Sequence, residues 1–230
     1  YVALAMICLE RGNDDLGIEI VDVGLHHRPD SSILHLHRGV LLAAKGETNE
    51  AEKAFETARA LAPDSPMPYT ALGIIWMQTG KPEKAVEVLR DATRRYRDDH
   101  VISYTFSLAL IRSGIDPMSP EAREAVNALR ASIDANDAFA PSRSELGRLL
   151  LKRNEIEEGI RQLEKAVALD SESTAALYNL AQAYRRKGDS ARARELFDRL
   201  TPLRGKPPSD ELEGVRQMML RAVTEGASKR

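Results

Sequence analysis

The chain has 230 residues, of which 30% are charged, 43% are hydrophobic and 5% are aromatic. This composition suits an all-helical array, and no run approaches the ~20 apolar residues that a transmembrane helix needs. The formal net charge of −2 gives no overall attraction for nucleic acid or for an anionic membrane. The single cysteine, Cys8, excludes an internal disulfide.

Two successive copies of a 34-residue unit run from Ser32 to Asp99, and the rest of the chain can be aligned with them. Self-similarity at one fixed period is a signature of repeat arrays, so the sequence predicts stacked helix-turn-helix units. Small and apolar residues mark the register. Gly39, Gly46, Ala51, Phe55 and Ala58 in the first copy correspond to Gly73, Gly80, Ala85, Leu89 and Ala92 in the second.

Local signals within one copy indicate where its helices begin and end. Ala51, Phe55 and Ala58 follow the spacing of one helical face, which predicts a buried stripe on the second helix. Gly46 fits a turn that needs positive φ, and Ser65 followed by Pro66 predicts an N-cap and first residue of the next helix.

The combination of a small residue in the first helix, a glycine between the helices, an alanine in the second helix and a closing proline resembles the tetratricopeptide repeat family. The resemblance implies a right-handed superhelical solenoid of antiparallel helix-turn-helix repeats, and it covers nearly the whole chain. The matching positions are Gly39, Gly73, Gly147 and Ala181; Gly12, Gly46, Gly80, Gly114 and Gly188; Ala51, Ala85, Ala125 and Ala193; and Pro29 and Pro63. Departures are Arg97, Asp137 and Ser171 at the proline position and Asn154 at the inter-helix glycine.

We expect about six repeats, followed by a helix that covers the exposed end of the stack. The fourth repeat has six extra residues, 115–120, which predict a loop with Ser119 as the following N-cap. That loop is either a tolerated insertion or a contact surface with Met118 exposed. The expected ranges are 1–31 (a partial repeat), 32–65, 66–99, 100–139, 140–173 and 174–207, then a capping helix and frayed tail over 208–230.

The resemblance also implies a concave groove lined mainly by the first helix of each repeat. When the groove positions of the family are carried over to this sequence, the expected lining is apolar in the second to fourth repeats and polar or basic in the fifth and sixth. The expected peptide-binding residues are Leu36, His37, Met67, Thr70, Ile74, Tyr104, Thr105, Leu108, Arg112, Arg148, Lys152, Tyr178, Asn179, Gln182 and Arg186. Further lining positions include Val40, Ala44, Ala71 and Gln78.

Such a groove would suit a peptide or protein with an apolar stretch and an acidic end. Some members of the family clamp a carboxyl terminus with Lys, Asn and Arg at fixed groove positions. Those positions in the early repeats hold Leu36, Val40, Met67, Ala71 and Thr105, so a chaperone-tail receptor is not expected.

No catalytic or metal-binding set is visible, and we expect neither an enzyme nor a cofactor. His35 and His37 lie on different faces of a helix, whereas a metal site needs several convergent ligands. Residues 174–207 carry an excess of basic side chains, but these are not interleaved with a regular series of stacking aromatic residues as in single-strand binders. RNA binding is therefore the weaker alternative.

The leading hypothesis is a non-catalytic scaffold that binds a protein or peptide segment in its groove. Two alternatives stay open: a self-association module that forms a homo-oligomer, and a docking arm of a larger, envelope-associated protein. The Ala- and Arg-rich repeats are typical of a bacterial protein. The chain begins at Tyr1 without an initiator methionine, so a missing upstream segment would leave the compartment open between cytoplasm and periplasm.

Overall fold

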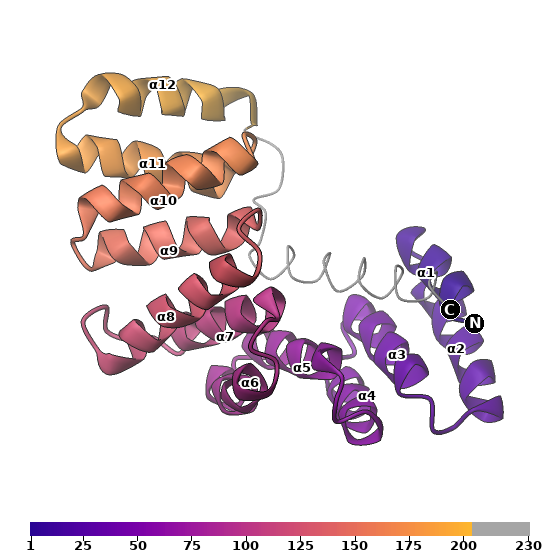
Figure 1. Ribbon diagram of the computed structural model, residues 1–230. Helices are drawn as coiled ribbons and strands as arrows, with labels where there is room; N and C mark the ends of the chain where they lie inside the picture. The colour runs from indigo at the N-terminus through magenta and orange to yellow at the C-terminus, as the bar shows by residue number, and fades with distance from the viewer. Residues whose placement is uncertain (204–230) are drawn as a thin grey trace. The chain divides into compact units, whose positions relative to one another are not determined.

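The computed structural model describes residues 1–203, and these residues form α-helices with no β-strand (Figure 1). This confirms the expected all-α class. The expected capping helix and tail at 208–230 lie outside the described residues. The helices are α1 (Val2–Glu10), α2 (Asp14–His27), α3 (Ser32–Lys45), α4 (Thr48–Leu61), α5 (Pro66–Gln78), α6 (Pro82–Arg95), α7 (His100–Arg112), α8 (Pro120–Ala135), α9 (Ala140–Lys152), α10 (Ile156–Leu169), α11 (Thr174–Lys187) and α12 (Ser190–Leu200), followed by a 3₁₀ turn at Thr201–Leu203.

The described residues divide into two compact units, 1–96 and 97–203. Unit 1 contains the helix pairs α1/α2, α3/α4 and α5/α6, and unit 2 contains α7/α8, α9/α10 and α11/α12. Within each pair the two helices pack on one another. Within residues 1–203, each helix is too short or too polar to cross a lipid bilayer.

The turn inside each pair depends on one residue in a left-handed conformation. Gly46 has φ of 87°, and the N–H of Glu47 donates to the carbonyl oxygen of Leu42 at 2.8 Å, which closes α3. The expected positive φ is thereby confirmed. Asn154, which replaces this glycine in the fifth repeat, adopts φ of 64° and keeps the same turn. Asparagine tolerates this conformation better than most residues, so the departure from the family pattern leaves the pair intact.

The small residue of the first helix permits very close helix packing. A Cβ atom built on Gly39 would lie 2.4 Å from the Phe55 ring, and one on Gly73 would lie 2.5 Å from a Leu89 methyl carbon. The second helix therefore places a large side chain directly against the backbone of the first. Any larger residue at either position would collide with the side chain of the second helix, so both positions require glycine.

The inserted loop between α7 and α8 is tied to a neighbouring repeat. The Nη1 atom of Arg153 donates to the carbonyl oxygen of Pro117 at 2.8 Å, while Met118 is 66% exposed. Ser119 caps α8, since its hydroxyl accepts from the N–H of Ala122 at 3.1 Å. Ser65 also stands at an N-cap, but its hydroxyl makes no capping hydrogen bond.

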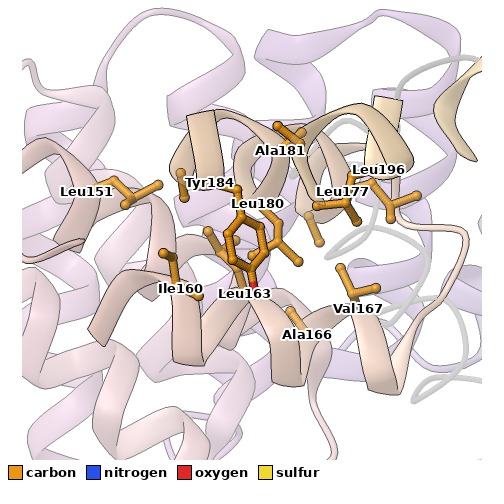
Figure 2. Packing of buried hydrophobic residues seen from close by; sticks show 13 residues of the cluster. Leu151, Ile160, Leu163, Ala166, Val167, Leu177, Leu180, Ala181, Tyr184 and Leu196 are labelled. Atoms are coloured by element: carbon orange, nitrogen blue, oxygen red, sulfur yellow. The ribbon is translucent and has the colours of Figure 1, made fainter. Parts of the chain in front are cut away.

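Buried leucine and alanine side chains form the core between successive pairs. Figure 2 shows the example in unit 2, where Val167 of α10 lies opposite Leu177 of α11, and Ile160 lies below Tyr184. In unit 1 the corresponding cluster contains Val21 of α2 together with Leu34 and Leu41 of α3, among others. Each repeat thus covers the apolar face of its neighbour.

Gly39→Ala should destabilise unit 1, because the added methyl would meet the Phe55 ring at 2.4 Å. Overpacking costs about 1–3 kcal/mol, and so short a contact belongs to the upper end of that range. The loss should exceed the ~1 kcal/mol that alanine gains in helix propensity. Urea unfolding monitored by Trp76, the only tryptophan and a buried residue of unit 1, would measure the net effect.

Phe55→Leu provides the control for that experiment, because a smaller side chain should restore part of the stability in the Gly39→Ala background. If Gly39→Ala has the same unfolding midpoint as the parent protein, the Phe55 ring can move away from the added methyl group without loss of stability.

Candidate functional site

Seven residues form an apolar pocket between α3 and α5 in unit 1. The pocket has about 460 Å³ of empty space, part of which opens to solvent. Four of its residues, Val40, Ala71, Ile74 and Gln78, are among those expected to line the groove. The other three are Ala43, Phe55 and Ile75.

Of the three residues that the groove prediction missed, Ala43 alone had a recognisable signal in the sequence, whereas Phe55 and Ile75 are identified by the structure. Ala43 is one helical turn from Val40, so it shares a face with that residue. Phe55 lies against Gly39 and thereby reaches α3 from the second helix of the same pair. Ile75 is adjacent to Ile74 and is almost fully buried.

Other expected groove residues of unit 1 are buried. Leu36 is 3%, His37 1% and Thr70 3% exposed, whereas Met67 is only partly buried. The Nδ1 atom of His37 lies 2.6 Å from the carbonyl oxygen of Ile33. A carbonyl can only accept, so Nδ1 carries the hydrogen. Burial lowers the pKa of His37 below its usual value of 6.5, which keeps the ring neutral near pH 7.

The expected residues of α7 lie in the interior of unit 2. Tyr104 is 2% exposed and packs edge-on against Phe139, with the ring centroids 5.3 Å apart. The hydroxyl of Thr105 donates to the carbonyl oxygen of Val101 at 2.7 Å, and Leu108 is fully buried. These three side chains therefore contribute packing, while Arg112 at the end of the same helix is exposed.

The expected cations of α9 and α11 have different surroundings. Arg148 makes a bidentate ion pair with Glu145, with contacts of 2.5–3.1 Å, and Glu145 is 4% exposed. Arg186 donates to the carbonyl oxygen of Leu151 at 2.7 Å and to Asn154, so it secures the end of α9. Lys152 is exposed.

The remaining expected residues are on α11. Tyr178 is 51% exposed and approaches Phe197 with ring centroids 6.3 Å apart. Asn179 and Gln182 are half-buried on the same helix. This helix therefore presents uncharged hydrogen-bonding groups beside one exposed aromatic ring.

Unit 1 should lose stability as the pH falls from 7.5 to 5.5. The pKa of His37 is lower in the folded protein than in the unfolded chain. Below pH 6.5 the unfolded chain therefore binds a proton before the folded protein does, which lowers the free energy of unfolding. One such proton contributes at most about 1.4 kcal/mol per pH unit. His37→Gln should flatten the pH dependence of urea unfolding followed by Trp76 fluorescence.

His26→Gln serves as the matched variant, because His26 is an exposed histidine of the same unit. Equal slopes for the parent and for His37→Gln would show that His37 does not carry the effect.

Arg148→Gln should destabilise unit 2 more than Glu145→Gln does. Removing the guanidinium leaves a buried carboxylate without its ion-pair partner, whereas removing the charge of Glu145 leaves the half-buried Arg148 with access to water. We expect a loss of about 1–3 kcal/mol for Arg148→Gln, measured by circular dichroism in urea. If Glu145→Gln lowers the free energy of unfolding more than Arg148→Gln does, the unpaired buried carboxylate is not the main cause of the instability.

The comparisons with known proteins agree with the repeat pattern. One tetratricopeptide repeat model matches residues 3–66 and 144–210, and a second matches residues 42–103. The chain is 24% identical over 172 residues to the anaphase-promoting complex subunit CDC16 of Saccharomyces cerevisiae, covering 73% of this chain and 20% of that protein. It spans about a fifth of the length of the curated relatives it matches.

Two solved structures show the same fold at low identity. PilW, a widely conserved type IV pilus biogenesis factor, superposes with a TM-score of 0.74 at 17% identity, over 93% of this chain and 96% of that one. YrrB, a TPR protein with an unusual peptide-binding site, gives a TM-score of 0.60 at 16% identity, over 90% and 99%. With family models covering most of the described helices, the chain belongs to the tetratricopeptide repeat family.

Proposed function

We propose that this protein is a non-catalytic scaffold that binds a segment of another protein on the first helices of its repeats. The apolar pocket between α3 and α5 carries the proposal. Concave, mostly apolar sites with a few polar groups are the usual places of ligand binding. The family supports a role in protein–protein interaction, and YrrB is a solved relative by fold that has a peptide-binding site.

The first helices of unit 2 add a basic element to this proposal. Lys152 at the end of α9 and Arg112 at the end of α7 are exposed. A cation at a helix C-terminus complements the helix dipole, and the exposed Lys152 is suited to meet an acidic partner segment. Arg148 is a weaker candidate for that role because its Nε and Nη2 atoms already donate to the buried carboxylate of Glu145.

Site-specific photocrosslinking tests where the partner binds. A photoreactive residue at exposed Gln78 of α5 should capture a partner, whereas one at exposed Glu87 of α6, the second helix of the same repeat, should not. Mass spectrometry would identify the captured segment. Capture from Glu87 alone would place the binding surface on the second helices and contradict the proposal.

Lys152→Glu should weaken binding of an acidic partner segment to unit 2 several-fold at low salt. The difference should shrink at high salt, because exposed charges are screened over about 10 Å at 0.1 M ionic strength. Fluorescence anisotropy with the synthetic segment at two salt concentrations would measure it. Lys165→Glu on α10 is the matched control, an exposed lysine of a second helix in the same unit.

Identical affinities for Lys152→Glu and Lys165→Glu would exclude an electrostatic role for the first-helix face of unit 2. The proposed role of the pocket in unit 1 would then stand alone.

A further inference from the structure

The pocket between α3 and α5 is uncharged throughout. Its lining comprises six apolar residues and one amide, Gln78, with no lysine, arginine, aspartate or glutamate. Burying a charged group without a partner is costly, so neither an ionic side chain nor a chain-terminal carboxylate gains by entering. An apolar side chain, by contrast, is stabilised by leaving water for such a lining.

The depth of the pocket follows from the sizes of its lining residues. Phe55 is 3% exposed and reaches the pocket from α4, while Val40 and Ile74 belong to the two first helices. Ala43 and Ala71 have only methyl groups, and larger residues at these positions would fill the space. The hollow is therefore a gap left by two alanines among larger side chains, which fits one inserted side chain.

Gln78 supplies the polar group of the pocket. It is exposed at the last residue of α5, and its amide both donates and accepts hydrogen bonds. A peptide backbone offers the same two functions. The equivalent repeat position at the ends of α7 and α9 carries Arg112 and Lys152. The third repeat, which contributes Gln78 to the pocket, thus has a neutral group at the position where the later repeats have a cation.

We infer that the pocket binds one leucine-sized apolar side chain from an internal stretch of a partner protein, with Gln78 hydrogen-bonded to the backbone of that stretch. This inference rests on the proposed function, and it specifies what the first-helix face of unit 1 selects. An internal stretch has amides on both sides of the inserted residue. A chain terminus would place a carboxylate beside a lining that has no cation.

Methyl NMR with small probes tests the inference without knowledge of the partner. N-acetyl-leucine methylamide has amides on both sides and should shift the methyl signals of Val40, Ile74 and Ile75. N-acetyl-leucine, which has a free carboxylate, should bind at least threefold more weakly. Ala71→Leu should abolish the shifts by filling the pocket. Ala175→Leu, at a half-buried first-helix position of unit 2, should leave them unchanged.

Two further variants keep the outcome clear. Ala43→Leu fills the pocket from the other helix and replaces Ala71→Leu should that variant unfold, as judged by Trp76 fluorescence. Gln78→Ala should keep the apolar contact, and hence the pattern of shifts, while weakening the blocked probe several-fold.

Absence of shifts in the parent protein would overturn the assignment of the pocket. Equal affinity for the two probes would overturn the selection of an internal stretch. The Ala71→Leu variant can also be photocrosslinked from position 78. An undiminished yield would mean that the partner still binds the first helices but does not use the pocket.

Discussion

The close contact between the two helices of a repeat determines most of what the structure can do. Phe55 lies against the backbone of α3 because no side chain stands at Gly39, and Leu89 uses Gly73 in the same way. Interhelical distances depend on the side chains at the contact, so a glycine there brings the axes together. The same Phe55 also lines the pocket. One packing constraint therefore holds the α3/α4 pair together and also gives the candidate site one of its walls.

The character of the first-helix face changes along the chain at a fixed repeat position. The residues at the ends of the first helices of the second to sixth repeats are Ala44, Gln78, Arg112, Lys152 and Arg186. In unit 1 this position is apolar or neutral, next to a pocket without charge. In unit 2 the residue at this position is basic, but Arg186 donates a hydrogen bond to the carbonyl oxygen of Leu151 near the end of α9. The first helices of the two units thus differ in charge at one repeat position, although both units are built from the same kind of helix pair.

The repeat pattern predicted the fold because each of its positions meets a structural requirement within a few residues of the chain. Gly46 and Asn154 each satisfy a left-handed turn, and the i, i+3, i+4 spacing identifies the buried stripe. Periodicity assigns a residue to a face without saying how deeply it is covered. Tyr104 and Leu108 share the predicted groove face, yet Phe139 and the interior of unit 2 enclose them. The pairing of Arg148 with Glu145, three residues apart on one helix, could have been read from the sequence.

A repeat protein is stabilised by contacts between nearest neighbours, so effects of substitution remain close to their origin. This locality explains how α9 can hold a nearly buried Glu145 whose charge Arg148 compensates within the same helix. It also explains how Ala43 and Ala71 can leave a hollow in unit 1 while Phe55 remains packed against Gly39. Ala43 and Ala71, whose small size leaves the hollow, are therefore separable from Gly39, which brings the α3/α4 pair together, whereas Phe55 takes part in both.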